Sequence, residues 1–363
     1  MIKNKIQKTS LLIVVIISIL IMNFNKFMPR INNVFAISST AEIVMELKTN
    51  RVVHAVNEKV KKYMASTTKI LTAITIIENC NLNDKVKVGK NTVGIEGSSI
   101  YLQEGEILTV EELLYGLMLR SGNDCAETLA VYCSGSIDNF ALLMNKMAKR
   151  IGANDSKFVN PHGLHNDNHY TTAYDLALIS CYAMKNDVFR KIVGTKSIKI
   201  PFTTQHTNRL LINKNKMLNQ FDAATGIKTG YTKKAGRCLV SSALKNGIEF
   251  ICVVLNCPQM FEISQRLLTS AFNEYKNYNI LNSDEILAFV DVDNNSEKCA
   301  VCTKNDIILP LKEIEKENLI IKYEIVNKLF LPIKKDQEVG FVKIYYQNNL
   351  LFEQKIYTII EMK

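Results

Sequence analysis

Three short polar segments, far apart in a chain of 363 residues, limit most strongly what this sequence can fold into. They read Ser66-Thr67-Thr68-Lys69, Ser121-Gly122-Asn123 and Lys228-Thr229-Gly230. The first opens a stretch of apolar residues at helical spacing, the second separates two such stretches, and the third lies in strand-like sequence. The pattern therefore predicts a helix start, an interhelical turn and a strand edge at these three places.

The remaining hydrophobic pattern predicts helices interleaved with β-hairpins, which is typical of an α/β (α+β) domain. Lys48-Thr49-Asn50 separates two apolar runs and indicates a hairpin, because asparagine tolerates a left-handed turn. We expect strands at 41–47, 51–55, 236–244 and 247–256, and helices at 66–79, 109–119, 123–133, 136–152, 172–185 and 261–276.

The composition changes after Asn277, where short β-rich runs separated by turn residues begin. These runs fall at 287–292, 307–311, 319–325, 340–346 and 354–360. We therefore predict a leader at 1–36, an α/β domain at 37–278 and a small all-β domain at 279–363. The length of the chain is consistent with two domains of roughly 100–200 residues each.

Residues 1–36 have the features of an export signal. Three lysines precede an apolar run at 11–22 that is interrupted only by Ser18, and Val34-Phe35-Ala36 offers a cleavage site of the small-x-small type. A membrane-spanning helix needs about 20 apolar residues, which favours a cleaved signal over a permanent anchor. The long polar gap before Ala36 leaves a retained N-terminal anchor open as the alternative. In both cases we expect the rest of the chain to be exported.

The formal net charge of +10 does not by itself indicate a nucleic-acid-binding protein. Five of the basic residues lie in the leader, which contains no acidic residue, so half of the charge belongs to the export signal. Phe341, Tyr345 and Tyr346 fit ordinary strand packing better than a surface that stacks nucleic-acid bases. We therefore expect no nucleic-acid partner.

The sequence predicts neither a metal site nor a cofactor. Nine cysteines cannot all pair because the number is odd, and they lie in apolar segments where free thiols act as small hydrophobes. Cys299 and Cys302 have redox or zinc spacing but lack a second pair. His162, His165 and His169 have no cysteines or carboxylates at ligand spacing. We interpret the cysteines as buried thiols.

The first polar segment has the chemistry of an activated nucleophile. Lys69 lies one helical turn after Ser66, so its amine can reach the serine hydroxyl. A serine hydroxyl reacts only when a neighbouring base takes its proton, and a lysine is a base only when neutral. Burial and the positive charge of Lys228 would both favour the neutral amine. A helix start at Ser66 also places its N–H near a developing oxyanion.

The other two segments supply binding and proton transfer. Ser121 can relay a proton to a leaving amine, and Asn123 can hydrogen-bond both the lysine and a substrate backbone. A strand edge at Lys228-Thr229-Gly230 can pair with an extended peptide, while Lys228 and Thr229 meet a carboxylate. Gly230 leaves room for the approaching peptide.

Each segment alone also has a structural interpretation. Ser66 can be only a helix N-cap, Ser121-Gly122-Asn123 only an interhelical turn, and Lys228-Thr229-Gly230 only the end of a hairpin. Together, in this order and in an exported chain, the three match the S-x-x-K, S-x-N and K-T-G set of penicillin-binding proteins and β-lactamases.

The chain resembles the D-alanyl-D-alanine carboxypeptidases, low-molecular-mass penicillin-binding proteins of the serine peptidase family S11. The similarity runs from about Ala36 to the last residue. It includes Tyr63-Met64-Ala65 before the nucleophile, Gly97-Ser98-Ser99, Leu119-Arg120 before Ser121, Phe158-Val159-Asn160-Pro161-His162-Gly163-Leu164, Gly226-Ile227 before Lys228, Tyr231-Thr232 after Gly230, and Leu331-Pro332-Ile333-Lys334 in the β domain.

The resemblance implies a role for each matching residue. Ser66 is then the acyl-enzyme nucleophile, Lys69 the proton acceptor and Ser121 the third catalytic residue. Asn123, Lys228, Thr229, Gly230 and Tyr231 are then substrate-binding residues, with the N–H groups of Ser66 and Tyr231 forming the oxyanion hole. The implied reaction removes the terminal D-alanine from peptidoglycan stem pentapeptides, outside the cytoplasm, with β-lactams acylating Ser66 as covalent inhibitors.

The sequence departs from the family pattern at a few positions. Met64 replaces a common proline, Asn50 replaces a turn glycine, and the basic residue expected within 255–261 is absent. The C-terminal amphipathic helix usual in the family is also missing after the last β-run, so membrane attachment would depend on residues 1–36.

Three other functions stay open. A class A β-lactamase needs a glutamate before the K-T-G segment, and residues 157–226 contain none. A catalytically silent cell-wall binding protein would not need Ser66, Lys69, Ser121 and Lys228 together. An endopeptidase that cuts D-alanine cross-links would use the same residues as a carboxypeptidase.

Overall fold

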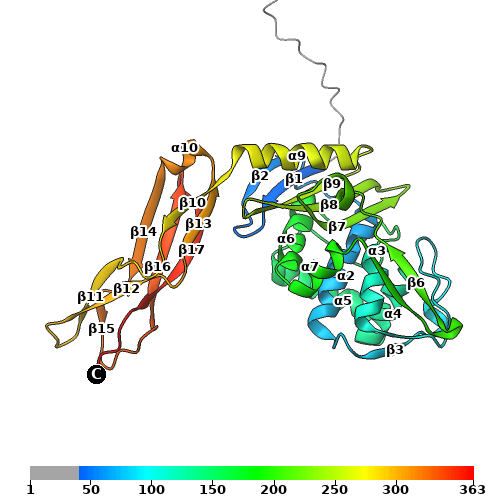
Figure 1. The fold of residues 1–363 in the computed structure, drawn as a ribbon, viewed down its shortest axis with the longest axis horizontal. Helices are drawn as coiled ribbons and strands as arrows, with labels where there is room; N and C mark the ends of the chain where they lie inside the picture. The colour runs from blue at the N-terminus through cyan, green and yellow to red at the C-terminus, as the bar shows by residue number, and fades with distance from the viewer. Residues whose placement is uncertain (1–40) are drawn as a thin grey trace, which may run out of the picture. The chain divides into compact units, whose positions relative to one another are not determined.

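The computed structural model describes residues 41–363, and the predicted leader lies outside them. One hydrophobic core of this region is built from residues within 41–255, and another from residues within 290–362. The expected combination of an α/β domain followed by an all-β domain is therefore confirmed (Figure 1). The predicted boundary at Tyr278 falls within the strand β10 (Lys276–Leu281), which pairs with a strand of the second core.

An antiparallel five-stranded sheet forms the frame of the α/β domain, with strand order β2-β1-β9-β8-β7. Strand β7, which carries the K-T-G segment, lies at one edge, as the sequence predicted. The strands are β1 (Ala41–Glu46), β2 (Val52–Val56), β7 (Ala224–Thr232), β8 (Gly236–Lys245) and β9 (Ile248–Leu255). All eight residues of β9 are buried, as expected for a central strand covered on both faces.

Helices cover both faces of this sheet (Figure 1). Helix α9 packs against β8 and β9, while α6 and α7 pack against β1, β9 and β7. The helices are α2 (Lys69–Asn79), α3 (Val110–Leu119), α4 (Asn123–Ser134), α5 (Ile137–Ile151), α6 (Ala173–Met184), α7 (Asp187–Gly194), α8 (Met217–Gln220) and α9 (Met260–Glu274). The six long helices expected from hydrophobic spacing are thus confirmed to within a few residues, whereas α7 was not predicted.

Helix α2 is the centre of the helical layer. Its first eight residues, from Lys69 to Ile76, are buried, and it contacts α3, α4, α5, α6 and α7. A helix that is apolar on all sides must be surrounded by other elements. The short 3-10 turn η1 (Ala65–Thr68) precedes it and contacts β7, so the buried helix carries its N-terminus to the sheet edge.

Two small hairpins and two short 3-10 turns complete the α/β domain. The hairpins are β3 (Lys85–Lys87) with β4 (Ile107–Thr109), and β5 (Ser197–Phe202) with β6 (Thr207–Ile212). Helix α3 begins at a capping box in which the Thr109 side chain accepts a hydrogen bond from the amide of Glu112. The remaining turns are η2 (Lys90–Thr92) and η3 (Thr203–Gln205).

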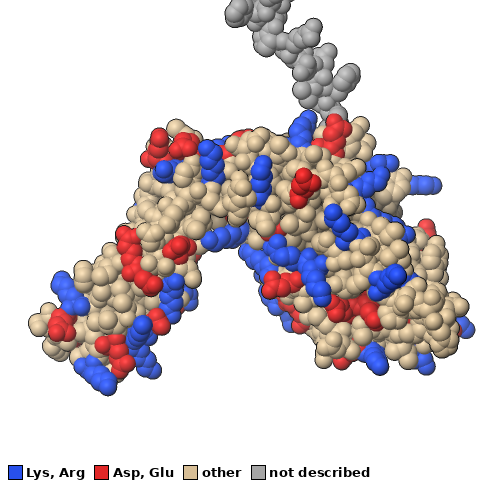
Figure 2. Space-filling view, in the orientation of Figure 1, with Lys and Arg blue, Asp and Glu red and all other residues tan. Residues whose placement is uncertain are grey.

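The second domain is a six-stranded sheet of order β14-β16-β17-β12-β11-β15, with the pair β10-β13 beside it. Its elements are β11 (Ala288–Val292), β12 (Lys298–Cys302), β13 (Ile307–Leu311), α10 (Glu313–Lys316), β14 (Leu319–Ile325), β15 (Lys328–Leu329), β16 (Glu338–Tyr346) and β17 (Asn349–Thr358). Figure 2 shows acidic and basic side chains interspersed on the visible face, in agreement with the mild positive surplus expected outside the leader.

We predict that Arg209→Met destabilises the α/β domain by about 3–5 kcal/mol, because it leaves the buried Glu106 carboxylate without its partner. Glu106 is fully buried, and Nη2 of Arg209 lies 2.8 Å from its Oε2. Chemical denaturation monitored by circular dichroism would measure the change. The matched control is Arg150→Met, which removes a largely exposed pair with Glu78 and should cost much less. Equal losses in the two variants would contradict the prediction.

Candidate active site

The three polar segments converge where the start of α2, the turn before α4 and the strand β7 meet. Ser66 lies in η1, directly after Ala65, whose φ of +49° is a conformation that residues with a side chain rarely adopt. The hydroxyl of Thr68 donates a hydrogen bond of 2.8 Å to the carbonyl of Ala65 and holds this turn. The strained turn thus places Ser66 at the entrance of the buried helix.

Gly163 packs directly against the turn that carries Ser66. A Cβ atom at this position would lie 1.9 Å from the carbonyl oxygen of Ala65, and the residue has a φ of +88°. Only glycine meets both requirements. The loop 160–164 can therefore lie directly against the turn that carries Ser66.

The Lys69 side chain is completely buried and makes three polar contacts. Its Nζ lies 2.7 Å from Oδ1 of Asn123, 2.7 Å from the carbonyl oxygen of His162 and 3.0 Å from Oγ of Ser66. The amide and carbonyl oxygens can only accept hydrogen bonds. A neutral amine has two N–H groups for these acceptors and one lone pair, which then faces the Ser66 hydroxyl. The contacts are thus those of a base aimed at the serine proton.

The electrostatics favour that neutral form. Burial, followed by the positive charges of Lys228 and Lys214, holds the pKa of Lys69 well below its usual value. Burial and Lys214 also lower the pKa of Lys228 to about 7. Lys69 and Lys228 have no carboxylate within 4 Å anywhere in residues 41–363. Two amines buried together without a countercharge cannot both remain protonated at low cost.

Ser121 and Asn123 lie at the turn between α3 and α4, as the sequence predicted. Ser121 is buried and has a φ of +64°. Asn123 is the first residue of α4, and its Nδ2 donates a hydrogen bond of 2.6 Å to the carbonyl of Glu96. That bond fixes the side-chain amide so that Oδ1 faces Lys69. The loop 96–102 thus orients Asn123, which in turn orients Lys69.

Asp124 fastens this loop to α4. Its buried carboxylate accepts hydrogen bonds from the Ser99 hydroxyl and from the amides of Ile100 and Leu102. An ionised carboxylate bonded to several N–H groups holds a loop more firmly than neutral contacts do.

Strand β7 brings the third segment against the Ser66 turn. Lys228 is buried, and its Nζ donates a hydrogen bond of 3.0 Å to the carbonyl of Thr229. A Cβ at Gly230 would lie 3.1 Å from the amide nitrogens of Ser66 and Thr67, so the two backbones approach closely here. Tyr231 follows with a largely exposed side chain. The Ser66 and Tyr231 amides therefore lie on adjoining segments, as an oxyanion hole requires.

Two histidines that the sequence left without a role have structural partners here. Nδ1 of His162 accepts from the amide of Leu164, so its Nε2–H points to the Glu127 carboxylate, 3.2 Å away. Nδ1 of His169 accepts from the amide of Val159, and its Nε2 lies 2.8 Å from the Thr68 hydroxyl. Burial lowers the pKa of His169 to about 3, so it stays neutral. His169 therefore supports the Ser66 turn through Thr68.

The described residues contain no group of three metal-ligating side chains. All nine cysteines are free, and all but Cys80 and Cys133 are buried. Cys299 and Cys302 lie on β12 in the core of the second domain. The cysteines thus occupy the apolar positions that their sequence surroundings predicted.

Sequence reasoning missed two groups at the site. Lys214 follows β6, donates a hydrogen bond of 2.9 Å to the Ser98 hydroxyl and lowers the pKa of both buried lysines. The backbone carbonyl of His162 accepts a hydrogen bond from Nζ of Lys69. Lys214 is one basic residue in the lysine-rich run 214–216, and a backbone carbonyl leaves no signal in a sequence, so neither stood out.

Comparisons with known proteins extend over both domains. The family model described as D-alanyl-D-alanine carboxypeptidase matches residues 28–259, and the model for the C-terminal domain of penicillin-binding protein 5 matches residues 275–363. The D-alanyl-D-alanine carboxypeptidase DacF of Bacillus subtilis is 30% identical over 333 residues, which cover 88% of this chain and 85% of that protein.

Solved structures show the same fold. The D-alanyl-D-alanine carboxypeptidase DacD of Francisella tularensis has a TM-score of 0.67 at 26% identity, over 92% of this chain and 99% of that chain. Penicillin-binding protein 5 of Haemophilus influenzae has a TM-score of 0.74 at 23% identity, over 89% of this chain and 97% of that chain.

The lowered pKa of Lys228 predicts how stability depends on pH. Between pH 7 and about 10.5 the unfolded chain holds a proton on this lysine that the folded protein releases, so stability rises with pH. From pH 7 to pH 9 the gain should be about 2 kcal/mol. The measurement is the free energy of unfolding at both pH values for the wild-type protein and for Lys228→Met. The same pH dependence in both proteins would contradict the assignment.

Proposed function

The chain belongs to the D-alanyl-D-alanine carboxypeptidase family of serine peptidases, and on this basis we propose that Ser66, Lys69 and Ser121 are its catalytic residues. The reaction of the family is release of the C-terminal D-alanine from peptidoglycan stem pentapeptides. The observation that carries the residue assignment is the set of contacts around Lys69, whose two acceptor neighbours leave its lone pair for the Ser66 hydroxyl.

Acylation follows from these contacts. Lys69 takes the proton of Ser66 while Oγ attacks the carbonyl carbon of the penultimate D-alanine. The developing oxyanion accepts hydrogen bonds from the amides of Ser66 and Tyr231. The tetrahedral intermediate then breaks its C–N bond, and the proton passes from Lys69 through Ser121 to the leaving amine. D-alanine departs and the remaining peptide stays as an ester on Ser66.

Hydrolysis repeats the same steps with water in place of the Ser66 hydroxyl. Lys69 takes a proton from the attacking water, and the proton returns to Oγ of Ser66 when the ester breaks. A β-lactam enters the same path, because its strained ring amide stands in for the peptide bond. The leaving nitrogen remains tethered to the acyl group, so the drug inhibits Ser66 covalently.

Substrate binding is assigned to β7 and α4. As an edge strand, β7 has free backbone groups with which an extended peptide can pair. Lys228 and Thr229 would bind the terminal carboxylate, with Lys214 as a further cation in the place of the missing basic residue. Gly230 lets β7 lie close to the Ser66 turn, and Asn123 would hydrogen-bond the peptide backbone from the opposite side.

We also propose that the protein works outside the cytoplasm, at the cell wall or the outer face of the cytoplasmic membrane. The lysines, apolar run and Ala36 site of the leader support this proposal. No helix within residues 41–363 is long and apolar enough to cross a bilayer. The alternatives are a cleaved signal and a retained anchor.

We predict that Lys69→Ala lowers the rate of penicillin acylation of Ser66 by about 10²–10⁴-fold, because the serine loses its base. Mass spectrometry of the covalent adduct would measure the rate, and release of free D-alanine from a stem pentapeptide would measure the reaction. Lys85→Ala, an exposed lysine on β3, is the matched control.

Three outcomes would count against the proposal. Acylation of Lys69→Ala at the wild-type rate would refute the base assignment. A wild-type protein with neither an adduct nor D-alanine release would support the silent binding protein. Cleavage of D-alanine cross-links without release of a terminal D-alanine would support the endopeptidase.

Cleavage of the leader predicts a mature protein that begins at Ile37. The intact mass of the protein recovered from the producing cells would test this. A mass that includes residues 1–36 would instead identify the leader as an anchor.

A further inference from the structure

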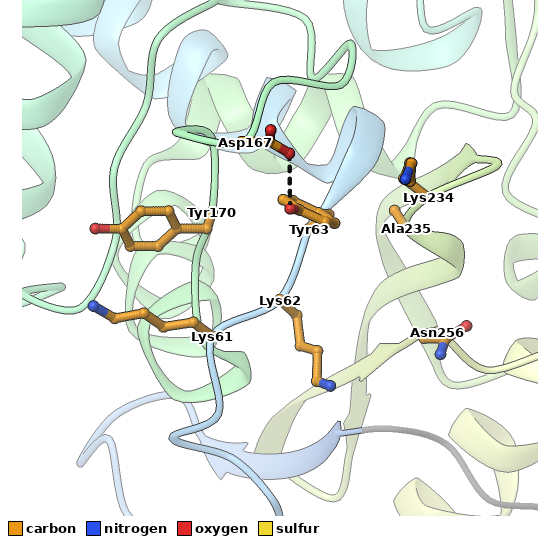
Figure 3. A pocket seen from close by; sticks show the side chains of 8 residues that line it. All are labelled: Lys61, Lys62, Tyr63, Asp167, Tyr170, Lys234, Ala235 and Asn256. Carbon is orange, nitrogen blue, oxygen red and sulfur yellow. Dashed lines mark hydrogen bonds between the residues drawn. The ribbon is translucent and has the colours of Figure 1, made fainter.

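A basic pocket lies beside the far end of β7, outside the catalytic contacts described above. It has a volume of about 380 Å³ and is lined by Lys61, Lys62, Tyr63, Asp167, Tyr170 and Lys234, among others (Figure 3). We call it the lysine pocket. Its walls come from the segment before Ser66, the loop before α6 and the turn between β7 and β8.

The lysine pocket has a surplus of positive charge. Asp167 is the only carboxylate among its lining residues, and Oδ1 of that residue already accepts from the Tyr63 hydroxyl at 3.1 Å and lies 3.3 Å from Nε2 of His165. None of the three lysines lies within 4 Å of a carboxylate in the described chain. An anion entering the pocket would therefore meet unpaired ammonium groups.

The pocket is joined to the active site along two chain segments. Lys62 and Tyr63 precede the Ser66 turn, and the backbone of Lys62 pairs with Thr171 beside it. Lys234 lies in the turn that ends β7, three residues after Tyr231. The amide of Ala235 donates a hydrogen bond of 3.0 Å to the Thr232 hydroxyl and closes this turn.

The direction of the substrate along β7 decides which part of it reaches the pocket. The terminal carboxylate is assigned to Lys228 and Thr229, and the scissile carbonyl to the amide of Tyr231. Residues on the acyl side of the scissile bond must then continue past Thr232 toward Lys234. Because an extended chain advances about 3.3 Å per residue, Lys234 is reached after two or three of these residues.

We propose that the lysine pocket binds a free carboxylate of the stem peptide two or three residues before the scissile bond. A γ-linked glutamate at that distance keeps its α-carboxylate, which matches the charge of Lys62 and Lys234. This inference rests on the proposed function, since the direction of the substrate comes from it. The pocket then selects stem peptides with an ionised acyl part over those in which that carboxylate is amidated.

The test compares two synthetic pentapeptides that differ only in this group. One has a γ-linked D-glutamate with a free α-carboxylate at the second position, and the other has the α-carboxamide. For the wild-type enzyme we expect kcat/KM for D-alanine release to be about three- to tenfold higher with the carboxylate, and the preference to shrink at high ionic strength. Lys62→Gln and Lys234→Gln should each reduce the preference, and the double variant should abolish it.

Lys245→Gln is the matched control, because Lys245 is an exposed lysine at the opposite end of β8. It should keep the full preference. Equal kcat/KM for the two peptides in the wild-type enzyme, or a preference that survives in the double variant, would overturn the proposal. Release of D-alanine from either peptide by the wild-type enzyme would meanwhile uphold the proposed function, so the two ideas fail separately.

Discussion

The burial of two lysine side chains side by side is the constraint on which the rest of the site depends. Lys69 and Lys228 are almost completely enclosed, and the described chain provides neither with a carboxylate within 4 Å. An ammonium group in such a place is costly, so the protein lowers the affinity of both amines for protons. In the proposed mechanism, this lowered proton affinity is what lets Lys69 act as the base that takes the serine proton.

Much of the surrounding structure keeps this amine aimed at Ser66. The contact from Glu96 fixes Asn123, and Asp124 fixes the loop that contains Glu96. On the other side, His169 holds Thr68, which holds the carbonyl of Ala65. These positioning groups lie on different segments of the chain. All of them act on Lys69 or on the turn that leads into the buried helix α2. The lysine pocket lies farther along β7, beyond these contacts, and we propose that it selects the substrate.

Local pattern was enough to predict the long helices and the central strands. Helices α5 and α9 each bury one face, so their apolar residues recur at helical spacing, and the buried strands β8 and β9 form long apolar runs. These patterns predicted the bounds of the elements to within a few residues. The elements that were missed are short or largely exposed. Strands β5 and β6 form a two-stranded ribbon with few buried residues, so they produce no clear alternation. Helix α7 has a clear apolar face, but with eight residues it spans only about two turns.

The sequence by itself determined which residues are proposed as the reacting groups, because the spacing of Ser66 and Lys69 and the order of the three polar segments can be read along the chain. The sequence predicted that Gly230 leaves room for a substrate peptide, whereas the close approach in the structure is to the chain's own Ser66 and Thr67 amides. Only the tertiary structure decided that Lys214 adds to the expected effect of Lys228 and that the His162 carbonyl accepts a hydrogen bond from Lys69, since these two groups come from segments 145 and 93 residues away. The protonation state of a buried amine depends on what the fold removes from water and places around it, and no local pattern encodes that environment.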